Sequence, residues 1–243
     1  MSALKKVKEP PLLSPPLMDR DWIIMTPADV RLMQVGLGEY RNKREWHRVL
    51  SRLYYMNALG LKVEATDEDK VGIGELLNRH RETGSGDWMA ETHYWMKGLG
   101  LFEGLTERDR ETMYEYVDKL RKHTWGPWGY PMFYMMEEVG APVRAEQEDR
   151  EGVIRWLQET RHGPTGESIL NAHYTCKRLG FPQQATDSDI VYIRGQLQEA
   201  REEKAYYCLP QMLYWIKELS PSWGDIREPH EMPSIPPLKR FRR

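Results

Sequence analysis

The sequence has few of the features that mark redox-active, secreted, membrane or nucleic-acid-binding proteins. Two cysteines, Cys176 and Cys208, fit neither a disulfide framework nor a metal-ligand spacing, so we expect reduced intracellular thiols. There is no charged-then-apolar leader and no apolar run near 18 residues, which predicts a cytoplasmic protein without a membrane span. The formal net charge is only −2, so no global field attracts nucleic acid, and we do not expect it as a partner.

Motifs of the common enzyme classes are also missing from the sequence. It contains neither a phosphate-binding G-x-x-x-x-G-K-[ST] loop nor a G-x-S-x-G nucleophile elbow. Glu159 and His162 form a single Glu-x-x-His pair, whereas a di-iron site in a helix bundle needs two such pairs. We therefore predict no catalytic residues, no metal and no cofactor, and we favour a protein that is not an enzyme.

What the sequence does contain is a repeat with a period of 40 residues and no gaps. Gly60, Gly100, Gly140 and Gly180 recur at this spacing, with a tyrosine six residues before each. A repeat of this length is typical of stacked supersecondary units that share one core. Five units are expected, starting near residues 26, 66, 106, 146 and 186. The tyrosine column comprises Tyr54, Tyr94, Tyr134, Tyr174 and Tyr214.

The start of each unit has the pattern of a capped helix. A threonine stands three residues before an aspartate at Thr26, Thr66, Thr106 and Thr186, and Glu146 takes this place in the fourth unit. An N-cap threonine and an acid at the third helical position satisfy two backbone amides reciprocally. The aspartates of this column are Asp29, Asp69, Asp109, Asp149 and Asp189.

An identical arginine follows the apolar stripe of the first helix in all five units. A cation in the last helical turn interacts favourably with the helix dipole. We predict that these arginines cap carbonyl groups or bridge to an acid of a neighbouring unit, a structural role; a ligand-binding row is the alternative. The column comprises Arg41, Arg81, Arg121, Arg161 and Arg201.

The second helix of each unit follows a corner that contains glycine, and in the second unit it is expected over roughly residues 88–99. The glycine at the end of this helix is expected in the left-handed C′ conformation, with a proline soon after it in several units. No segment has a strand pattern. The sequence thus predicts an all-α fold of five αα-hairpins over residues 22–220, arranged as an open arc or a partial α/α toroid.

Proline-rich basic tails flank the repeat over residues 1–21 and 221–243. Proline fixes φ and removes a hydrogen-bond donor, so extended chain is expected there instead of helix. Disordered ends are one interpretation. The other is that apolar residues among the prolines dock on a partner or across the ends of the array.

The segments from Thr92 to Gly100 (THYWMKGLG) and from Leu76 to Trp88 (LLNRHRETGSGDW) resemble a known repeat. They are similar to the prenyltransferase and squalene-oxidase repeat, which builds the α/α toroids of protein prenyltransferases and terpenoid cyclases. The resemblance covers residues 26–220. It implies a ring of hairpins around an aromatic cavity that binds an isoprenoid, with about six hairpins in a closed toroid of this type.

This sequence departs from that family at the positions that carry its chemistry. The Asp-x-Cys zinc motif has no counterpart where it would align, and strings such as Asp67-Glu68-Asp69 coincide with helix caps instead of forming an Asp-x-Asp-Asp acid. His93 and His173 occupy equivalent places in two second helices; they are core residues or, alternatively, face a concavity. The candidate cavity or concave face comprises Glu91, His93, Tyr94, Trp95, Phe133, Tyr134, His173, Tyr174 and Tyr214.

Two hypotheses of function follow. The first is a non-catalytic scaffold or accessory subunit, which binds a larger protein complex through its concave face and through residues 1–21 and 221–243. The second is a diverged isoprenoid-binding protein, or a small prenyltransferase- or cyclase-like enzyme, with an aromatic-lined cavity.

Overall fold

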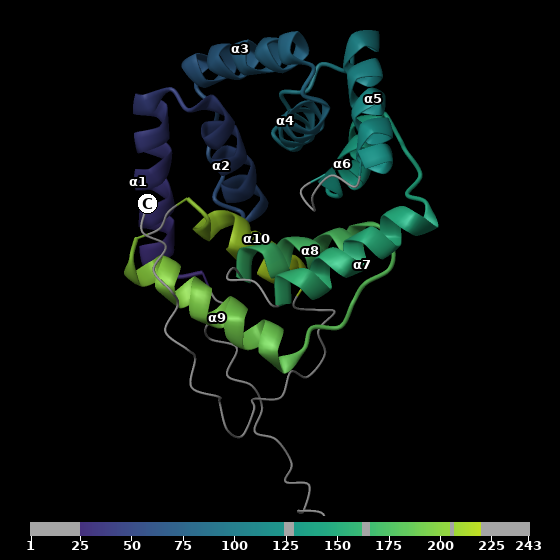
Figure 1. The fold of residues 1–243 in the computed structure, drawn as a ribbon. Helices are drawn as coiled ribbons and strands as arrows, with labels where there is room; N and C mark the ends of the chain where they lie inside the picture. Colours follow the sequence, from purple (N-terminus) through teal and green to yellow (C-terminus); the bar gives the residue numbers. More distant parts are fainter. Residues whose placement is uncertain (1–24, 124–128, 162–165, 205–206, 220–243) are drawn as a thin grey trace, which may run out of the picture.

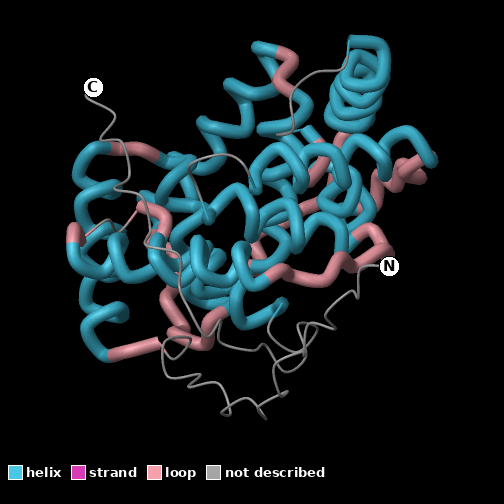
Figure 2. Tube along the Cα trace, turned by 60° about the horizontal axis from the view of Figure 1, so that its bottom comes forward, coloured by secondary structure: helices cyan, strands magenta, loops and turns pink. Residues whose placement is uncertain are grey.

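The computed structural model describes residues 25–123, 129–161, 166–204 and 207–219, and within these ranges it contains ten α-helices and no strand (Figures 1 and 2). The all-α prediction is therefore confirmed. Both proline-rich tails fall outside the described residues. No helix of the described part combines the length and apolar character needed to cross a bilayer.

The helices are α1 (Pro27–Lys43), α2 (Trp46–Ala58), α3 (Asp67–Thr83), α4 (Gly86–Gly98), α5 (Glu107–His123), α6 (Met132–Val139), α7 (Gln147–Arg161), α8 (Gly166–Arg178), α9 (Asp187–Glu202) and α10 (Leu209–Leu219).

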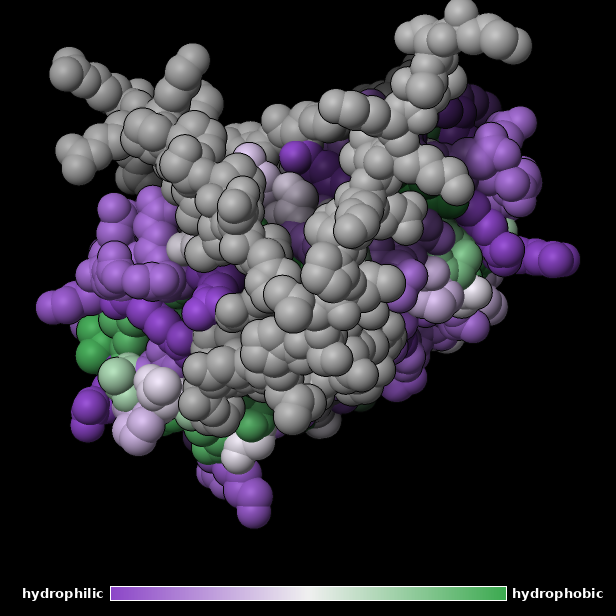
Figure 3. Space-filling model, turned by 90° about the horizontal axis from the view of Figure 1, so that it is seen from below, coloured by the Kyte–Doolittle hydropathy of each residue, from purple (hydrophilic) through white to green (hydrophobic). Residues whose placement is uncertain are grey.

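The odd-numbered helices form an outer layer and the even-numbered helices an inner layer (Figure 1). One stripe of each outer helix faces inward, and its central residues are at most 1 % exposed. The opposite stripes are charged and solvated, as expected for amphipathic helices. Figure 3 shows the molecule from below: hydrophilic residues predominate among the described residues around the edge of this view, with separate small hydrophobic patches. The central inward residues are Met33, Ile73, Met113, Val153 and Ile193.

The outer helices begin at the caps expected from the sequence. Thr66 Oγ1 accepts a hydrogen bond from the Asp69 amide, and the Asp69 carboxylate accepts one from the Thr66 amide. The same reciprocal pair occurs at Thr26, Thr106 and Thr186. Each cap contributes about 1 kcal/mol to helix stability.

The fifth hairpin contacts the first, so the described helices surround a common axis. Arg201 of α9 pairs with Asp29 of α1, and Lys217 of α10 donates to the Ala58 carbonyl at the end of α2. The inner helices α10 and α2 also pack against each other. The expectation of an open arc is therefore wrong.

Five hairpins close because the inner helices pack directly on one another instead of enclosing a wide hollow. The tyrosine column meets at the axis, where neighbouring rings lie 5.3–6.0 Å apart between centroids. Such edge-on and tilted arrangements are favourable for aromatic pairs. Close contact also depends on Gly98, where a Cβ would lie 2.4 Å from the Tyr54 ring.

Candidate functional site

The repeated arginines and aspartates join each outer helix to the next and do not form a ligand site. Arg41 donates through Nε and Nη2 to Asp69, and the equivalent arginine–aspartate pairs link the other units, with shortest N–O distances of 2.6–2.8 Å. The sequence predicted arginines that bridge to an acid of a neighbouring unit, and the structure contains them. Burial alone would raise the pKa of Asp109, but hydrogen bonds from Arg81 and Thr106 outweigh it and lower the pKa to about 2.

His93 and His173 lie between the layers and do not face a central cavity. His93 Nε2 is 3.4 Å from the Asp109 carboxylate, and His173 Nε2 is 3.2 Å from that of Asp189. Both imidazoles are 1 % exposed. Burial lowers the pKa of His93 to about 4, although Asp109 opposes this shift. Of the two interpretations of these histidines, core residues and side chains that face a concavity, these contacts support the first, so their place in the predicted concave face was wrong.

Three predicted cavity tyrosines belong to the packed centre. Tyr94 accepts a hydrogen bond from Tyr54, and the hydroxyls of Tyr174 and Tyr214 lie 2.9 Å apart. Burial raises the pKa of Tyr94 and of Tyr214. These tyrosines fill the axis of the ring instead of lining a hollow. Phe133, at the position equivalent to His93, is 1 % exposed and contacts the Arg121 guanidinium of the outer helix α5.

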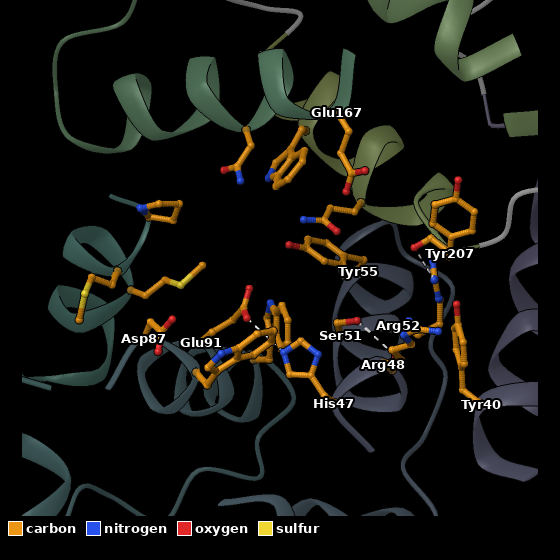
Figure 4. Close-up of a pocket in the computed structure, with 18 of the residues that line it drawn as sticks. Tyr40, His47, Arg48, Ser51, Arg52, Tyr55, Asp87, Glu91, Glu167 and Tyr207 are labelled. Atoms are coloured by element: carbon orange, nitrogen blue, oxygen red, sulfur yellow. Dashed lines mark hydrogen bonds and ion pairs between the residues drawn. The ribbon is translucent and has the colours of Figure 1, made fainter. Parts of the chain in front are cut away.

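A chamber of about 770 Å³ opens at the end of the ring where the inner helices begin (Figure 4). Positions four residues apart on one inner helix line it at successive depths, because they share one helical face. On α2 these are His47, Ser51 and Tyr55; on α4 they are Asp87, Glu91 and Trp95. The other inner helices and the segments before them contribute Pro131, Met132, Tyr134, Met135, Glu167, Asn171, Tyr207, Gln211 and Trp215.

His47 and Glu91 form a polar pair on one wall of the chamber. His47 Nε2 lies 3.1 Å from Glu91 Oε2, and both side chains are about one quarter exposed. The imidazole is held between Trp88 and Trp95, with ring centroids 4.4 and 5.0 Å away. The indole rings therefore fix the orientation of a group that can accept or donate a hydrogen bond.

Arg52 and Glu167 are two further charged residues of the chamber lining. Arg52 is 3 % exposed and donates through Nη2 to the Tyr207 carbonyl at 2.7 Å, while its Nε has no partner among the described residues. Burial raises the pKa of Glu167, and the nearby positive charge of Arg52 opposes the shift. In Figure 4 the Glu167 carboxyl group points into the chamber from the wall opposite His47.

Of the predicted cavity residues, the chamber brings together Glu91, Trp95 and Tyr134. Sequence reasoning missed His47, Arg52 and Glu167 as site residues. The repeat is the signal that would have found His47 and Glu167. Both are equivalent to Asp87, which lies four residues before Glu91 and eight before Trp95 on the same inner helix. No group of three or more metal-ligating side chains is gathered anywhere in the described ranges.

Three comparisons with known proteins were made. No protein-family model, no curated protein and no solved structure matches the chain. The resemblance to the prenyltransferase and squalene-oxidase repeat thus stays a prediction.

Proposed function

We propose that the chamber binds a small, oxygen-rich organic ligand with a flat apolar face, and that a cyclic carbohydrate is the class that fits best. One observation carries the proposal: carboxylate, amide and aromatic side chains line the same chamber, among them Glu91, Asn171, Gln211 and Trp95. Amide and carboxylate groups can bond to several hydroxyls of one ligand.

The size and lining of the chamber support this class. Small-molecule sites commonly enclose about 300–1,000 Å³ and combine aromatic walls with a few polar groups. Tyr55, Trp95 and Trp215 are the aromatic residues of the lining; each is at most 4 % exposed, so they give the chamber a packed apolar base. Asn171 and Gln211 can donate and accept hydrogen bonds at once, as sugar hydroxyls do, and the carboxylates accept from hydroxyls.

An isoprenoid diphosphate is the second candidate. Lys43, Arg48 and Arg52 line one side of the chamber and would hold the diphosphate, while the aromatic floor would hold the chain. Three carboxyl groups, those of Asp87, Glu91 and Glu167, line the same chamber and would repel it. The balance of charge therefore favours a neutral, hydroxyl-bearing ligand.

Titration of tryptophan fluorescence and calorimetry with a panel of saccharides and farnesyl diphosphate tests both candidates. We expect saturable binding of a saccharide and about tenfold weaker binding by Gln211→Ala. Gln198→Ala, on an outer helix where the amide bonds only to Glu202, is the matched control and should bind as wild type. Saturable binding of farnesyl diphosphate alone would assign the second candidate; no binding of either class would overturn the assignment of the chamber.

The scaffold hypothesis remains a separate proposal: its partner contacts were predicted at the concave face and in residues 1–21 and 221–243, and both tails lie outside the described residues. A partner that co-purifies with the full chain, and is lost when either tail is removed, would support it. Unchanged co-purification without the tails would contradict it.

A further inference from the structure

We infer that the ligand is a chain of two or more sugar-like rings, and that the unit outside the chamber lies on Trp88 in a second hollow. The inference rests on the proposed function, since it extends the same site. It names an oligosaccharide as the substrate class, as opposed to a single ring.

The second hollow shares lining residues with the chamber. It measures about 500 Å³ and lies between the start of α2 and the end of α3, lined by Arg44, Leu76, Arg79, His80 and Ser85 among others. His47, Arg48 and Trp88 line both spaces. A ligand that fills the chamber can therefore continue past Trp88 without leaving the protein surface.

Trp88 is an exposed aromatic residue that is held in place at this junction. It is 44 % exposed, although large apolar side chains are normally covered. His47 contacts it edge-on at 4.4 Å, and His80 is stacked nearly parallel to it at 6.2 Å between centroids. A rigid, exposed indole offers contact area at little cost in conformational entropy.

His80 supports Trp88 from beneath the second hollow. It is 9 % exposed, and its ring is stacked on the Trp88 ring. Its Nε2 is buried, so His80 positions Trp88 and does not itself contact a ligand.

The charges around Trp88 favour a neutral chain over an anionic polymer. Arg48 is already paired with Glu45 at 2.8 Å, and Arg44 lies 3.8 Å from Glu68. An anionic chain would next have to pass Asp87 and Glu91 inside the chamber. Hydroxyl groups can bond to all of these side chains.

Calorimetry with matched malto-, cello-, xylo- and chito-oligosaccharide series, from one to six units, tests the inference. We expect one series to bind the full chain at least tenfold more tightly as length increases from one unit to three. Trp88→Ala should weaken binding of the trimer at least tenfold, and His80→Leu should reduce the gain with length. Tyr114→Ala removes an equally exposed aromatic residue from α5, outside both hollows, and should bind as wild type.

The outcomes separate the two levels of the proposal. A single sugar that binds as tightly as its oligomers would overturn the second subsite and leave the chamber proposal standing. A gain with length that persists in Trp88→Ala would overturn the role of Trp88. Absence of binding for every series and length would overturn both the inference and the carbohydrate assignment.

Discussion

A single methyl group decides how closely the inner helices approach one another at the axis. A Cβ at Gly98 would lie 2.4 Å from the Tyr54 ring, whereas a Cβ at Gly38 of α1 would meet nothing within 4 Å. Alanine is about 1 kcal/mol better than glycine in a helix interior. Gly38→Ala should therefore stabilise the protein by up to about 1 kcal/mol, while Gly98→Ala should destabilise it by about 1–3 kcal/mol because Tyr54 must shift. Urea unfolding measures both; equal effects would show that the tyrosine contact is absent.

A buried neutral histidine makes the fold sensitive to acid. The pKa of His93 falls from an ordinary value near 6.5 to about 4, because burial disfavours the imidazolium more than Asp109 favours it. Between these values the unfolded chain binds a proton that the folded chain does not, so stability falls as the pH drops through this window. The loss between pH 7 and pH 5 is about 2 kcal/mol.

Replacing His93 by leucine should remove this part of the acid sensitivity. The equivalent residues Leu53 and Leu213 show that the repeat accepts leucine here. Unfolding free energies at pH 7 and pH 5 should then differ by about 2 kcal/mol less in His93→Leu than in wild type. A variant with the same pH dependence as wild type would contradict the assignment of a neutral, buried imidazole.

At the scale of the helix, each outer element is fixed at its start by one aspartate with two functions. Asp69 caps α3 together with Thr66. Its carboxylate also accepts hydrogen bonds from Nε and Nη2 of Arg41 in the preceding unit. Thr66→Ala removes only the cap and should cost about 1 kcal/mol. Asp69→Ala also removes the carboxylate that pairs with the Arg41 guanidinium, and should lower the free energy of unfolding by about 3 kcal/mol or more. Thermal unfolding distinguishes the two, and similar costs would mean that the joint between units contributes nothing.

Local features of these elements could be predicted from the sequence, whereas the direction of inner side chains could not. Thr66, Asp69 and Arg41 act through short-range or repeated contacts, so their spacing is sufficient to predict them. His93, Tyr94 and Trp95 are consecutive, and each step turns the side chain by about 100° around the helix. His93 therefore faces the outer layer, Tyr94 faces the axis, and Trp95 faces the chamber. The sequence analysis placed all three on one cavity face, which was wrong for His93 and for Tyr94.

At the scale of the molecule, ring closure creates the chamber and lay beyond sequence reasoning. Residues from α2, α4, α8 and α10 line one space only because the last hairpin returns to the first. The repeat specifies five units, but the angle between neighbouring units depends on side-chain packing at the axis. Comparison with larger toroids suggested that six hairpins were needed. The direct packing of the tyrosines removes that requirement.

The most direct test of the closed ring is a double-mutant cycle on Asp29 and Arg201, the joint between the last and first units. The matched reference is Asp69 and Arg41, because for both aspartates the preceding unit of the ring has leucine, not histidine, at the position equivalent to His93 (Leu213 for Asp29 and Leu53 for Asp69). Asp→Asn and Arg→Gln substitutions, singly and together, are measured by urea unfolding. Closure predicts equal coupling energies for the two pairs, in the range of about 0.5–3 kcal/mol for contacting residues. Zero coupling for Asp29 and Arg201, with coupling retained for Asp69 and Arg41, would show that the ends are apart in solution and would contradict the account.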